Sequence, residues 1–337
     1  MKIKVLVVDD SALIRSLMTE IIKSASDMEL VGTAQDAFVA RDLVNKFAPD
    51  VITLDIEMPK VDGLTFLSRL MKARPTPVVM MSTLTQEGAD ATFKSIELGA
   101  VDFIAKPSLD VVNGINQYSG LILEKIRTAN QANVRRKPKQ VKAPPKIINN
   151  KKATKIIAIG ASTGGTEAIR ELLEQFPADS PGIVITQHLP SGFTQSYANR
   201  LNRHTQLNVF EAKGGEVIQP GTAYLAPGGK HLTIIKSGGH YVTQLDDSEK
   251  VCGHKPSVDL MFNSLAEFGM DNVIAIILTG MGKDGAQGMK KIYQNGGFTI
   301  AQNEETCVVF GMPREAIKLE VVHNVLALED IAANVFN

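Results

Sequence analysis

The stretch Lys155-Ile156-Ile157-Ala158-Ile159-Gly160-Ala161-Ser162-Thr163-Gly164-Gly165 runs from an apolar segment directly into a glycine-rich turn. A continuous apolar run of this length predicts a buried strand of a parallel sheet, and the turn after it predicts the start of a helix. Side chains at the carboxyl end of a parallel strand face the crevice in which ligands bind. Ser162 therefore has the position of a candidate nucleophile.

The alternation of strand and helix continues downstream of this turn. The pattern predicts a helix over 166–175, a strand over 182–186, a helix over about 192–202 and a strongly buried strand over 273–279. Residues 207–245 are richer in glycine and β-branched residues and contain the turn sequence Ala226-Pro227-Gly228-Gly229, which predicts hairpins. Residues 153–337 are therefore expected to form an open α/β domain with a parallel sheet and a hairpin insertion.

The first third of the chain has the same rhythm. Apolar runs over 5–8, 51–54, 78–81 and 102–105 predict strands, a helix is expected from about Ser11, and another over about 121–128 closes the segment. Strands that alternate with helices indicate a parallel sheet, so residues 1–125 are expected to form a separate α/β domain.

A segment of different composition lies between these two domains. The chain has 337 residues, 44% apolar and 21% charged, which is typical of two globular domains. Residues 1–125 carry 13 basic and 17 acidic side chains, 126–152 carry 9 basic and no acidic ones, and 153–337 carry 14 basic and 19 acidic ones. Residues 126–152, which include Pro138 and Pro144-Pro145, are expected to be a basic flexible linker. Because no aromatic residues interleave its charges, we expect no nucleic-acid partner.

Several classes of protein are disfavoured by what the chain lacks. No apolar run has the length of a membrane span and the start does not resemble a signal peptide, so a cytoplasmic protein that is not inserted in a membrane is expected. Two cysteines, Cys252 and Cys307, cannot build a disulfide framework or a thiolate zinc site, and no His-Glu-x-x-His pair is present. We therefore expect no metal or other cofactor in the second domain.

Acidic side chains follow the strands of the first domain. Asp9 and Asp10 end one apolar run and Asp55 ends its neighbour, so their carboxylates are expected to converge and to need a hard cation such as Mg²⁺. Lys106 and Ser82 end two further runs and could contact phosphoryl oxygens on Asp55.

This portion resembles the response-regulator receiver domain, a doubly wound, flavodoxin-like fold. The resemblance depends on five stretches: Val7-Val8-Asp9-Asp10-Ser11, Leu54-Asp55-Ile56-Glu57-Met58-Pro59, Asp62-Gly63, Met81-Ser82-Thr83 and Phe103-Ile104-Ala105-Lys106-Pro107. It implies that Asp55 takes phosphate from a chemotaxis histidine kinase and that Ser82 and Phe103 relay the change.

The resemblance also implies a ligand set for Mg²⁺. Asp10, Asp55 and the carbonyl of Glu57 would ligate the cation, and Asp9 would support it through water. Ser82 stands where many receivers have threonine, a departure that keeps the hydroxyl.

Two downstream residues complete a catalytic hypothesis for Ser162. His188 follows the strand over 182–186, and Asp284 lies in the glycine loop after the strand over 273–279. Their shared place beyond parallel strands predicts a Ser-His-Asp triad, in which His188 deprotonates Ser162 and Asp284 orients the imidazole. The amides of Thr163 and Met281 are candidates for an oxyanion hole.

Other interpretations of these residues remain open at this point. The glycine turn could bind a phosphate, although its spacing is not Gly-x-Gly-x-x-Gly. The order Ser, His, Asp also differs from that of α/β-hydrolases. The remaining histidines and Cys307 are expected to be structural or surface residues: His204, His231, His240, His254 and His323.

The second portion resembles the catalytic domain of the CheB family of chemotaxis protein-glutamate methylesterases. The matching stretches are Ile159-Gly160-Ala161-Ser162-Thr163-Gly164-Gly165, Gln187-His188-Leu189-Pro190, Ala226-Pro227-Gly228, Lys255-Pro256-Ser257-Val258-Asp259 and Thr279-Gly280-Met281-Gly282-Lys283-Asp284-Gly285-Ala286. The resemblance implies hydrolysis of glutamyl methyl esters, and deamidation of glutamines, on the cytoplasmic helices of methyl-accepting chemoreceptors. It also implies that the resting receiver covers the active-site crevice. Rival hypotheses are a receiver-linked DNA-binding regulator and a nucleotide-binding oxidoreductase.

Overall fold

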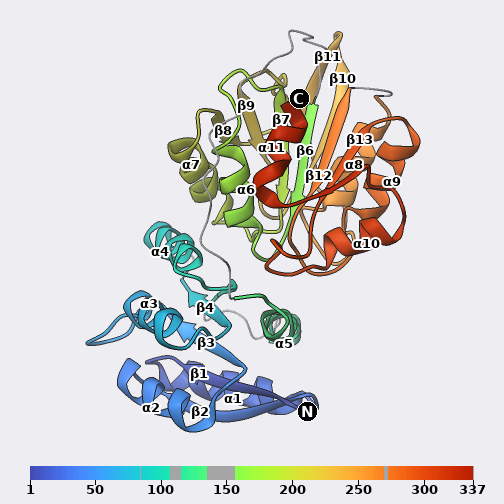
Figure 1. The fold of residues 1–337 in the computed structure, drawn as a ribbon. Helices are drawn as coiled ribbons and strands as arrows, with labels where there is room; N and C mark the ends of the chain where they lie inside the picture. The colour runs from blue at the N-terminus through green and yellow to red at the C-terminus, as the bar shows by residue number, and fades with distance from the viewer. Residues whose placement is uncertain (84, 107–114, 135–155, 269–271, 337) are drawn as a thin grey trace. The chain divides into compact units, whose positions relative to one another are not determined.

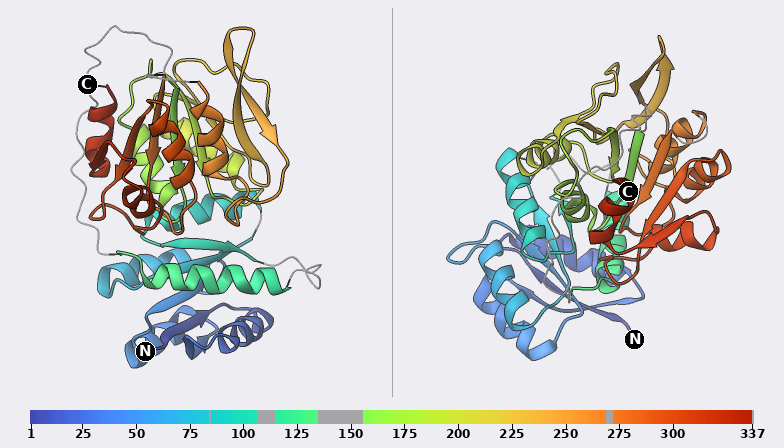
Figure 2. Two further views of the ribbon diagram at one scale, coloured as in Figure 1. Left: turned by 90° about the vertical axis from the view of Figure 1, so that its right-hand side faces the viewer. Right: turned by 45° about the horizontal axis from the view of Figure 1, so that its top comes forward.

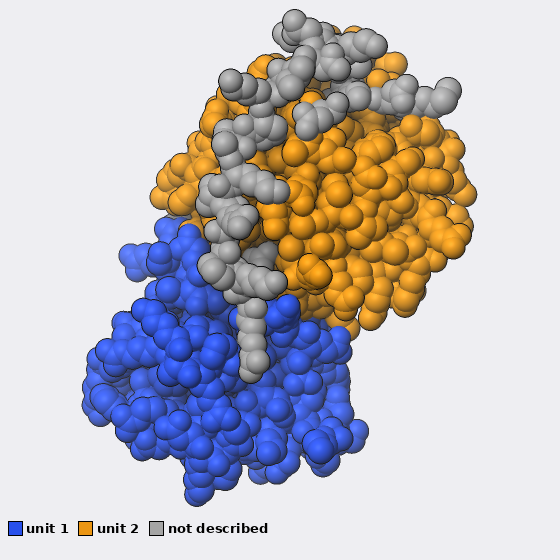
Figure 3. Space-filling view, in the orientation of Figure 1, with its two compact units in different colours: residues 1–136 blue, residues 137–337 orange. Residues whose placement is uncertain are grey.

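The chain divides into two units, residues 1–136 and 137–337, which Figure 3 shows in different colours. This computed structural model describes residues 1–83, 85–106, 115–134, 156–268 and 272–336. Most of the expected linker, 126–152, lies outside the described residues, although its first part belongs to a helix that ends at Asn130. Among the described residues, every helix is too short or too polar to cross a bilayer.

The first unit contains a parallel sheet of five strands in the order β2-β1-β3-β4-β5. The strands are β1 (Ile3–Val8), β2 (Met28–Ala34), β3 (Val51–Asp55), β4 (Val78–Ser82) and β5 (Asp102–Ala105). The helices are α1 (Ala12–Ser24), α2 (Ala37–Phe47), α3 (Gly63–Ala73), α4 (Gln86–Glu97) and α5 (Ile115–Asn130). Helices α1 and α5 contact each other, as do α3 and α4, and Figure 1 shows the two groups on opposite sides of the sheet.

The second unit contains a parallel sheet of seven strands in the order β14-β13-β12-β6-β7-β9-β8. Its strands are β6 (Ile156–Ala161), β7 (Gly182–Gln187), β8 (Asn208–Glu211), β9 (Thr222–Leu225), β12 (Val273–Ile277), β13 (Phe298–Gln302) and β14 (Asn324–Leu326). All residues of β6, β7 and β12 are buried, which explains why their sequences are apolar apart from Thr186 and Gln187 at the end of β7.

Helices cover both faces of this sheet. They are α6 (Gly165–Leu173), α7 (Thr194–His204), α8 (Val258–Ala266), α9 (Ala286–Gln294), α10 (Met312–Lys318) and α11 (Leu328–Phe336). Helix α6 contacts α7 and α11, whereas α9 contacts α8 and α10. In Figure 1, α6 and α11 lie in front of the strands. The α/β fold class expected for both domains is therefore confirmed.

The sheet order reverses around β6, which lies between β7 and β12. The chain adds β7 on one side of β6, and later returns to add β12 on the other side. At such a switch point the loops after the central strands diverge and leave a crevice at the carboxyl edge. This topology brings the loops after β6, β7 and β12 to one place.

The sequence interpretation of residues 207–245 needs a correction. A hairpin is present, since β10 (His231–Ser237) and β11 (His240–Asp246) pair antiparallel, and Figure 2 shows it extending past the main sheet. Strands β8 and β9, however, pair in parallel with each other and extend the main sheet beyond β7. The intervening segment crosses back over the sheet, which glycine content alone does not reveal. Strands β2, β13 and β14 were not anticipated from the sequence either.

Candidate active site

Ser162 lies in the turn between β6 and α6. Its amide donates to the carbonyl of Thr279 at 3.0 Å, and its own carbonyl accepts from the amide of Gly165 at 2.7 Å. Gly164, with φ of 76°, precedes α6 in the left-handed conformation that glycine adopts without steric cost. These bonds tie the Ser162 backbone to the loop after β12 and leave the residue partly exposed.

His188 directly follows β7, the strand that pairs with β6 and therefore ends beside Ser162. Its amide donates to the carbonyl of Ala161 at 3.2 Å, and the Gln187 side chain donates through Nε2 to the Ser162 carbonyl at 2.9 Å. Because neighbouring strands lie about 4.8 Å apart, the two backbones run side by side at this edge. The His188 side chain is 8% exposed, so its imidazole is shielded from most competing water.

Asp284, in the loop before α9, holds the imidazole. His188 Nε2 lies 2.8 Å from Asp284 Oδ2. The same carboxylate accepts from the Ser257 hydroxyl at 2.8 Å and from the amides of Val258 and Asp259 at 2.7 and 2.9 Å. Four donors use the full acceptor capacity of a carboxylate.

The charge of Asp284 is favoured by these contacts. Burial alone would raise the pKa of Asp284, but the hydrogen bond and charge of His188, with the two α8 amides, outweigh burial and lower the pKa below its usual value. The amides belong to the first turn of α8, where the helix dipole also favours an anion. Asp284 is therefore ionised at neutral pH and can stabilise a positively charged His188.

The orientation of the His188 ring leaves one nitrogen for Ser162. Nε2 faces Asp284, whereas Nδ1 is buried and has no hydrogen-bond partner among the described residues. In the best-known serine proteases the aspartate contacts Nδ1 and Nε2 serves as the base. In this protein the roles of the two ring nitrogens are exchanged, so Nδ1 of His188 is the atom that could take a proton from Ser162.

The loop after β12 approaches the serine closely. A Cβ added to Gly280 would lie 2.8 Å from Cβ of Ser162, so only glycine fits at this position. The Thr279 hydroxyl donates to the Thr163 carbonyl at 3.0 Å, which fixes the two candidate oxyanion segments together. The Met281 amide donates to no residue in the described part of the chain. Thr163 and Met281 thus lie on the two segments that flank Ser162.

The acidic residues of the first unit also converge. Oxygens of Asp9, Asp10 and Asp55 lie within 4.8 Å of one another, and Lys106 Nζ lies 2.7 Å from Asp55 Oδ2 and 3.2 Å from Asp9 Oδ2. Burial raises the pKa of Asp55 to about 6, assisted by the charge of Asp9 and opposed by Lys106. The backbone amide of Glu57 donates to Asp55 Oδ1 at 3.2 Å.

This acidic cluster has the chemistry of a magnesium site. Its donors are carboxylate oxygens, and among the described residues Lys106 is the only partner of the buried Oδ2 atoms of Asp9 and Asp55. One ammonium group cannot neutralise three clustered carboxylates, so a hard divalent cation fits these residues.

The two expected relay residues face α4. The Ser82 hydroxyl donates to the Gly88 carbonyl at 3.1 Å and accepts from the Thr92 hydroxyl at 2.6 Å. The buried ring of Phe103 packs edge-on against Phe93 of α4, with centroids 6.3 Å apart. Both side chains therefore connect the phosphoacceptor end of the sheet to the same helix.

Comparisons with known proteins identify the family. A model described as CheB methylesterase matches residues 157–335, and one described as response regulator receiver domain matches residues 5–112. A protein of Shewanella sp. (strain MR-7) named protein-glutamate methylesterase/protein-glutamine glutaminase 2 is 58% identical over 343 residues, which cover 100% of this chain and 98% of that protein. This chain belongs to the CheB methylesterase family. The rival hypotheses of a DNA-binding regulator and an oxidoreductase receive no support from these matches.

A second relative and a solved structure of the CheB family are also similar to this chain. A Salmonella typhi protein named protein-glutamate methylesterase/protein-glutamine glutaminase is 53% identical over 336 residues, which cover 98% of this chain and 95% of that protein. The crystal structure of the Thermotoga maritima CheB methylesterase catalytic domain superposes with a TM-score of 0.54 at 40% identity, and the match covers 55% of this chain and 98% of that one.

Three residues of this CheB-family site were not anticipated as functional. Ser257 and Asp259 lie in a stretch that matched the family, yet neither was given a role. His254 was expected to be structural or on the surface, but its ring stacks on that of His188 with centroids 3.8 Å apart. The sequence signal was present, since three polar residues surround a Lys255-Pro256 turn. The residues that they contact, however, lie in loops far away along the chain: His188 after β7 and Asp284 before α9.

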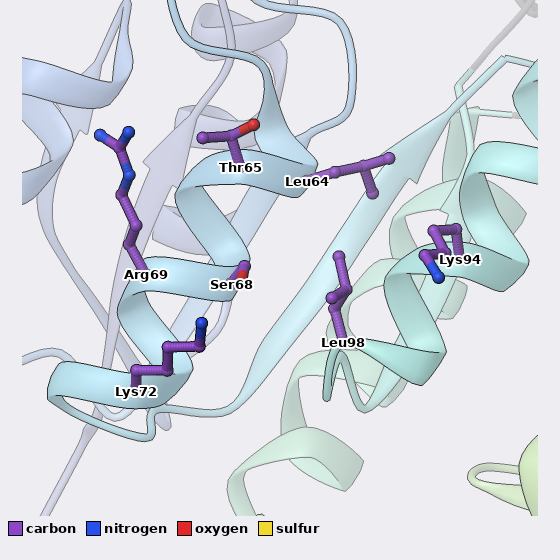
Figure 4. Close-up of a pocket in the computed structure, with 7 residues that line it drawn as sticks. All are labelled: Leu64, Thr65, Ser68, Arg69, Lys72, Lys94 and Leu98. Carbon is purple, nitrogen blue, oxygen red and sulfur yellow. The ribbon is translucent and has the colours of Figure 1, made fainter.

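A separate depression lies between α3 and α4 in the receiver unit. Its volume is about 410 Å³, and Figure 4 shows basic side chains of both helices around it. The seven lining residues are Leu64, Thr65, Ser68, Arg69, Lys72, Lys94 and Leu98. None of them is acidic, and none belongs to the catalytic or phosphoacceptor groups, so this depression is distinct from both sites.

Proposed function

We propose that this protein is a phosphorylation-activated protein-glutamate methylesterase and protein-glutamine glutaminase that acts on the cytoplasmic helices of chemoreceptors. The observation that carries the proposal is the His188 to Asp284 hydrogen bond at the sheet edge where Ser162 ends the neighbouring strand. Relatives that match almost the entire chain bear the names of these two activities. We assign phosphate acceptance to residues 1–125, hydrolysis to 153–337, and the connection to 126–152.

Ester hydrolysis proceeds in two steps in this proposal. The Ser162 oxygen attacks the carbonyl carbon of the glutamyl methyl ester while His188 Nδ1 takes the hydroxyl proton. The C–O bond to the methoxy group then breaks, His188 returns the proton, and methanol leaves a glutamyl ester on Ser162. Water, deprotonated by His188, attacks this ester, the C–O bond to Ser162 breaks, His188 returns the proton to the Ser162 oxygen, and glutamate leaves. A glutamine side chain would release ammonia instead of methanol.

Asp284 and two backbone amides stabilise the charges that develop during the reaction. Asp284 stabilises the imidazolium that forms in each step and holds the ring through Nε2. The amides of Thr163 and Met281 donate to the oxyanion of the tetrahedral intermediate, where hydrogen bonds are worth more than in the ground state. We propose no metal or other cofactor for this unit.

The receiver unit supplies control. Asp55 accepts the phosphoryl group from a chemotaxis histidine kinase, and Lys106 pairs with the added oxygens. Asp10, Asp55 and the Glu57 carbonyl would hold Mg²⁺, with Asp9 acting through water, and the bound cation would neutralise charge on the phosphoryl oxygens. Ser82 and Phe103 transmit the change toward α4. A cytoplasmic location, without membrane insertion or nucleic-acid binding, is part of the same proposal.

The decisive experiment compares the native protein with Ser162→Ala. Methylated receptor in membranes is the substrate, methanol release is the readout, and a small phosphodonor is added or omitted. The Ser162→Ala protein should release no methanol above background, while its Asp55 should take up phosphate normally. Retained turnover in this variant would eliminate Ser162 as the nucleophile, and loss of phosphate uptake as well would indicate a general folding defect.

A further inference from the structure

The turn from Val251 to His254 places a second imidazole at the active site. The amide of Val251 donates to the His254 carbonyl at 3.1 Å, and the amide of His254 donates to the Val251 carbonyl at 2.9 Å. Cys252 and Gly253 have φ of 51° and 84°. Positive φ at both central residues, with reciprocal end bonds, is the pattern of a tight type I′ turn. The two reciprocal hydrogen bonds fix the backbone of His254 relative to that of Val251.

The ring of His254 lies against the face of the catalytic imidazole. The two rings are 12° from parallel and their centroids are 3.8 Å apart, closer than the 4.5–7 Å usual for aromatic pairs. The opposite constraint on His188 is the hydrogen bond from Nε2 to Asp284. The bond fixes one edge of the ring and the stack fixes its plane, so rotation of the His188 ring is restricted.

The stack also has an electrostatic consequence. During each step of the proposed reaction His188 gains a proton and becomes positively charged. A cation that lies over the face of a neutral aromatic ring is attracted by the ring electrons, so the contact favours protonated His188 when His254 is itself neutral. The contact is therefore worth more in the transition state than before proton transfer, which is the condition for raising kcat.

We propose that His254 is a positioning residue of the esterase, whose stacked ring keeps His188 in its catalytic orientation and stabilises its protonated form. The inference rests on the proposed function, because it assumes that His188 is the base. It differs from a merely structural role, in which His254 would only close the turn and any residue compatible with that turn would replace it.

The test compares three variants of the full-length protein. His254→Gln keeps polarity but removes the ring, and His254→Phe keeps a stacking ring of similar width. His240→Ala, on the exposed end of the β10–β11 hairpin, is the matched control. Methanol release from methylated receptor gives kcat and KM, and NMR of histidine-labelled protein gives the ring-proton shifts of His188.

The expected results separate positioning from folding. His254→Gln should lower kcat about 3- to 30-fold with KM within about 2-fold of the native value. His254→Phe should recover kcat to within about 3-fold, and His240→Ala should match the native protein. The upfield ring-current shifts of His188 protons should persist in His254→Phe and disappear in His254→Gln.

Specific outcomes would overturn the proposal. Native kcat in His254→Gln would show that the stack does not contribute, and a change confined to KM would assign His254 to substrate binding instead. If His254→Gln unfolds, the comparison of His254→Phe with native protein decides, and a Phe variant that folds, keeps the ring-current shifts and yet loses kcat contradicts stacking. If native protein releases no methanol, the proposed function fails, whereas the NMR comparison still tests the stack.

Discussion

At the scale of single residues, the carboxylate of Asp284 is the most heavily hydrogen-bonded group of the proposed triad. It is 1% exposed, and each of its four hydrogen bonds connects it to a different donor. One of these donors, Ser257, has two tasks, since its hydroxyl donates to Asp284 at 2.8 Å and accepts from the amide of Leu260 at 3.4 Å. The amide of Ser257 in turn donates to Nδ1 of the buried His231 at 3.1 Å. The position of the His188 ring thus depends on a chain of contacts that runs through Asp284 and Ser257 to His231.

Ser257→Ala should therefore reduce catalysis without removing a reacting group. Loss of the hydrogen bond to the charged carboxylate and of the α8 cap predicts a fall in kcat of about 10-fold and a loss of about 2–3 kcal/mol in the free energy of unfolding. Ser257→Thr keeps the hydroxyl and should retain most of both. Steady-state kinetics and urea unfolding provide the measurements. Equal activity of the Ala and Thr variants would show that this hydroxyl has no influence on Asp284.

The raised pKa of Asp55 predicts a pH-dependent stability of the receiver unit. Because the folded state raises this pKa from 3.8 to about 6, folding favours the protonated carboxyl. That contribution is complete below pH 3.8 and is lost as the pH rises through about 6. Without Mg²⁺, Asp55→Asn should stabilise the unit by about 1–2 kcal/mol at pH 8, which is less than the full pKa shift would give because Lys106 loses a partner in the variant. At pH 5 the gain should be much smaller, because Asp55 of the native protein is then largely protonated.

Hydrogen exchange of β3 amides in EDTA-containing buffer measures this difference. Asp42→Asn, an exposed residue on α2, is the matched control and should change stability by less than about 0.5 kcal/mol at both pH values. A gain for Asp55→Asn that is equal at pH 5 and pH 8 would contradict burial as the cause of the shifted pKa.

At the scale of secondary structure, the start of α8 contacts the end of β6, the loop that carries Asp284, and α9. A Cβ added to Gly160 would lie 2.2 Å from Val258 Cγ1, and one added to Gly285 would lie 2.6 Å from the same atom. The first two amides of the helix hold Asp284, and the Asp259 carboxylate accepts from the Gly288 amide at 2.7 Å. Helix α8 therefore links the serine turn, the aspartate loop and α9. Small residues are required where these segments approach.

Two helical glycines test this requirement with opposite expected signs. In Gly288→Ala the new Cβ would lie 2.6 Å from Cβ of Phe262, so α9 must move away from α8, at a cost of about 1–3 kcal/mol and with loss of activity. In Gly120→Ala nothing lies within 4 Å of the new Cβ, and α5 should gain about 0.5–1 kcal/mol. Hydrogen exchange of α9 and α5 reports each change. Stabilisation by both variants would show that α8 and α9 can separate without cost.

At the scale of the whole molecule, one unit has the chemistry of a phosphate switch and the other that of a hydrolase. The net negative charge of both domains and the basic segment 126–152 between them are features of the sequence. A ligand or modification can change activity only through a difference in its affinity for two states. Phosphate on Asp55 is the modification that the receiver chemistry supports.

Two changes separate intrinsic from controlled activity. Deletion of residues 1–130 should raise basal methanol release, because the resting receiver is expected to inhibit the esterase and the truncated enzyme lacks it. Asp55→Asn in the full chain should keep the low basal rate and lose stimulation by a small phosphodonor. Both rates are measured on methylated receptor with and without the phosphodonor. If neither change alters the rates, the receiver does not regulate this esterase.

The sequence alone determined the α/β class, the two-part organisation and the strand-end positions of Ser162, His188, Asp284 and Asp55. It could do so because apolar runs specify parallel strands, and parallel strands bring their carboxyl ends to one edge. Only the tertiary structure decided that β8 and β9 pair in parallel, that Nε2 of His188 faces Asp284, and that His254 stacks on the same ring. The two contacts of His188 depend on where loops return after roughly 60 to 100 residues, and the β8–β9 pairing depends on the path of the short segment between those strands; loop paths carry no periodic signal from which contacts could be predicted.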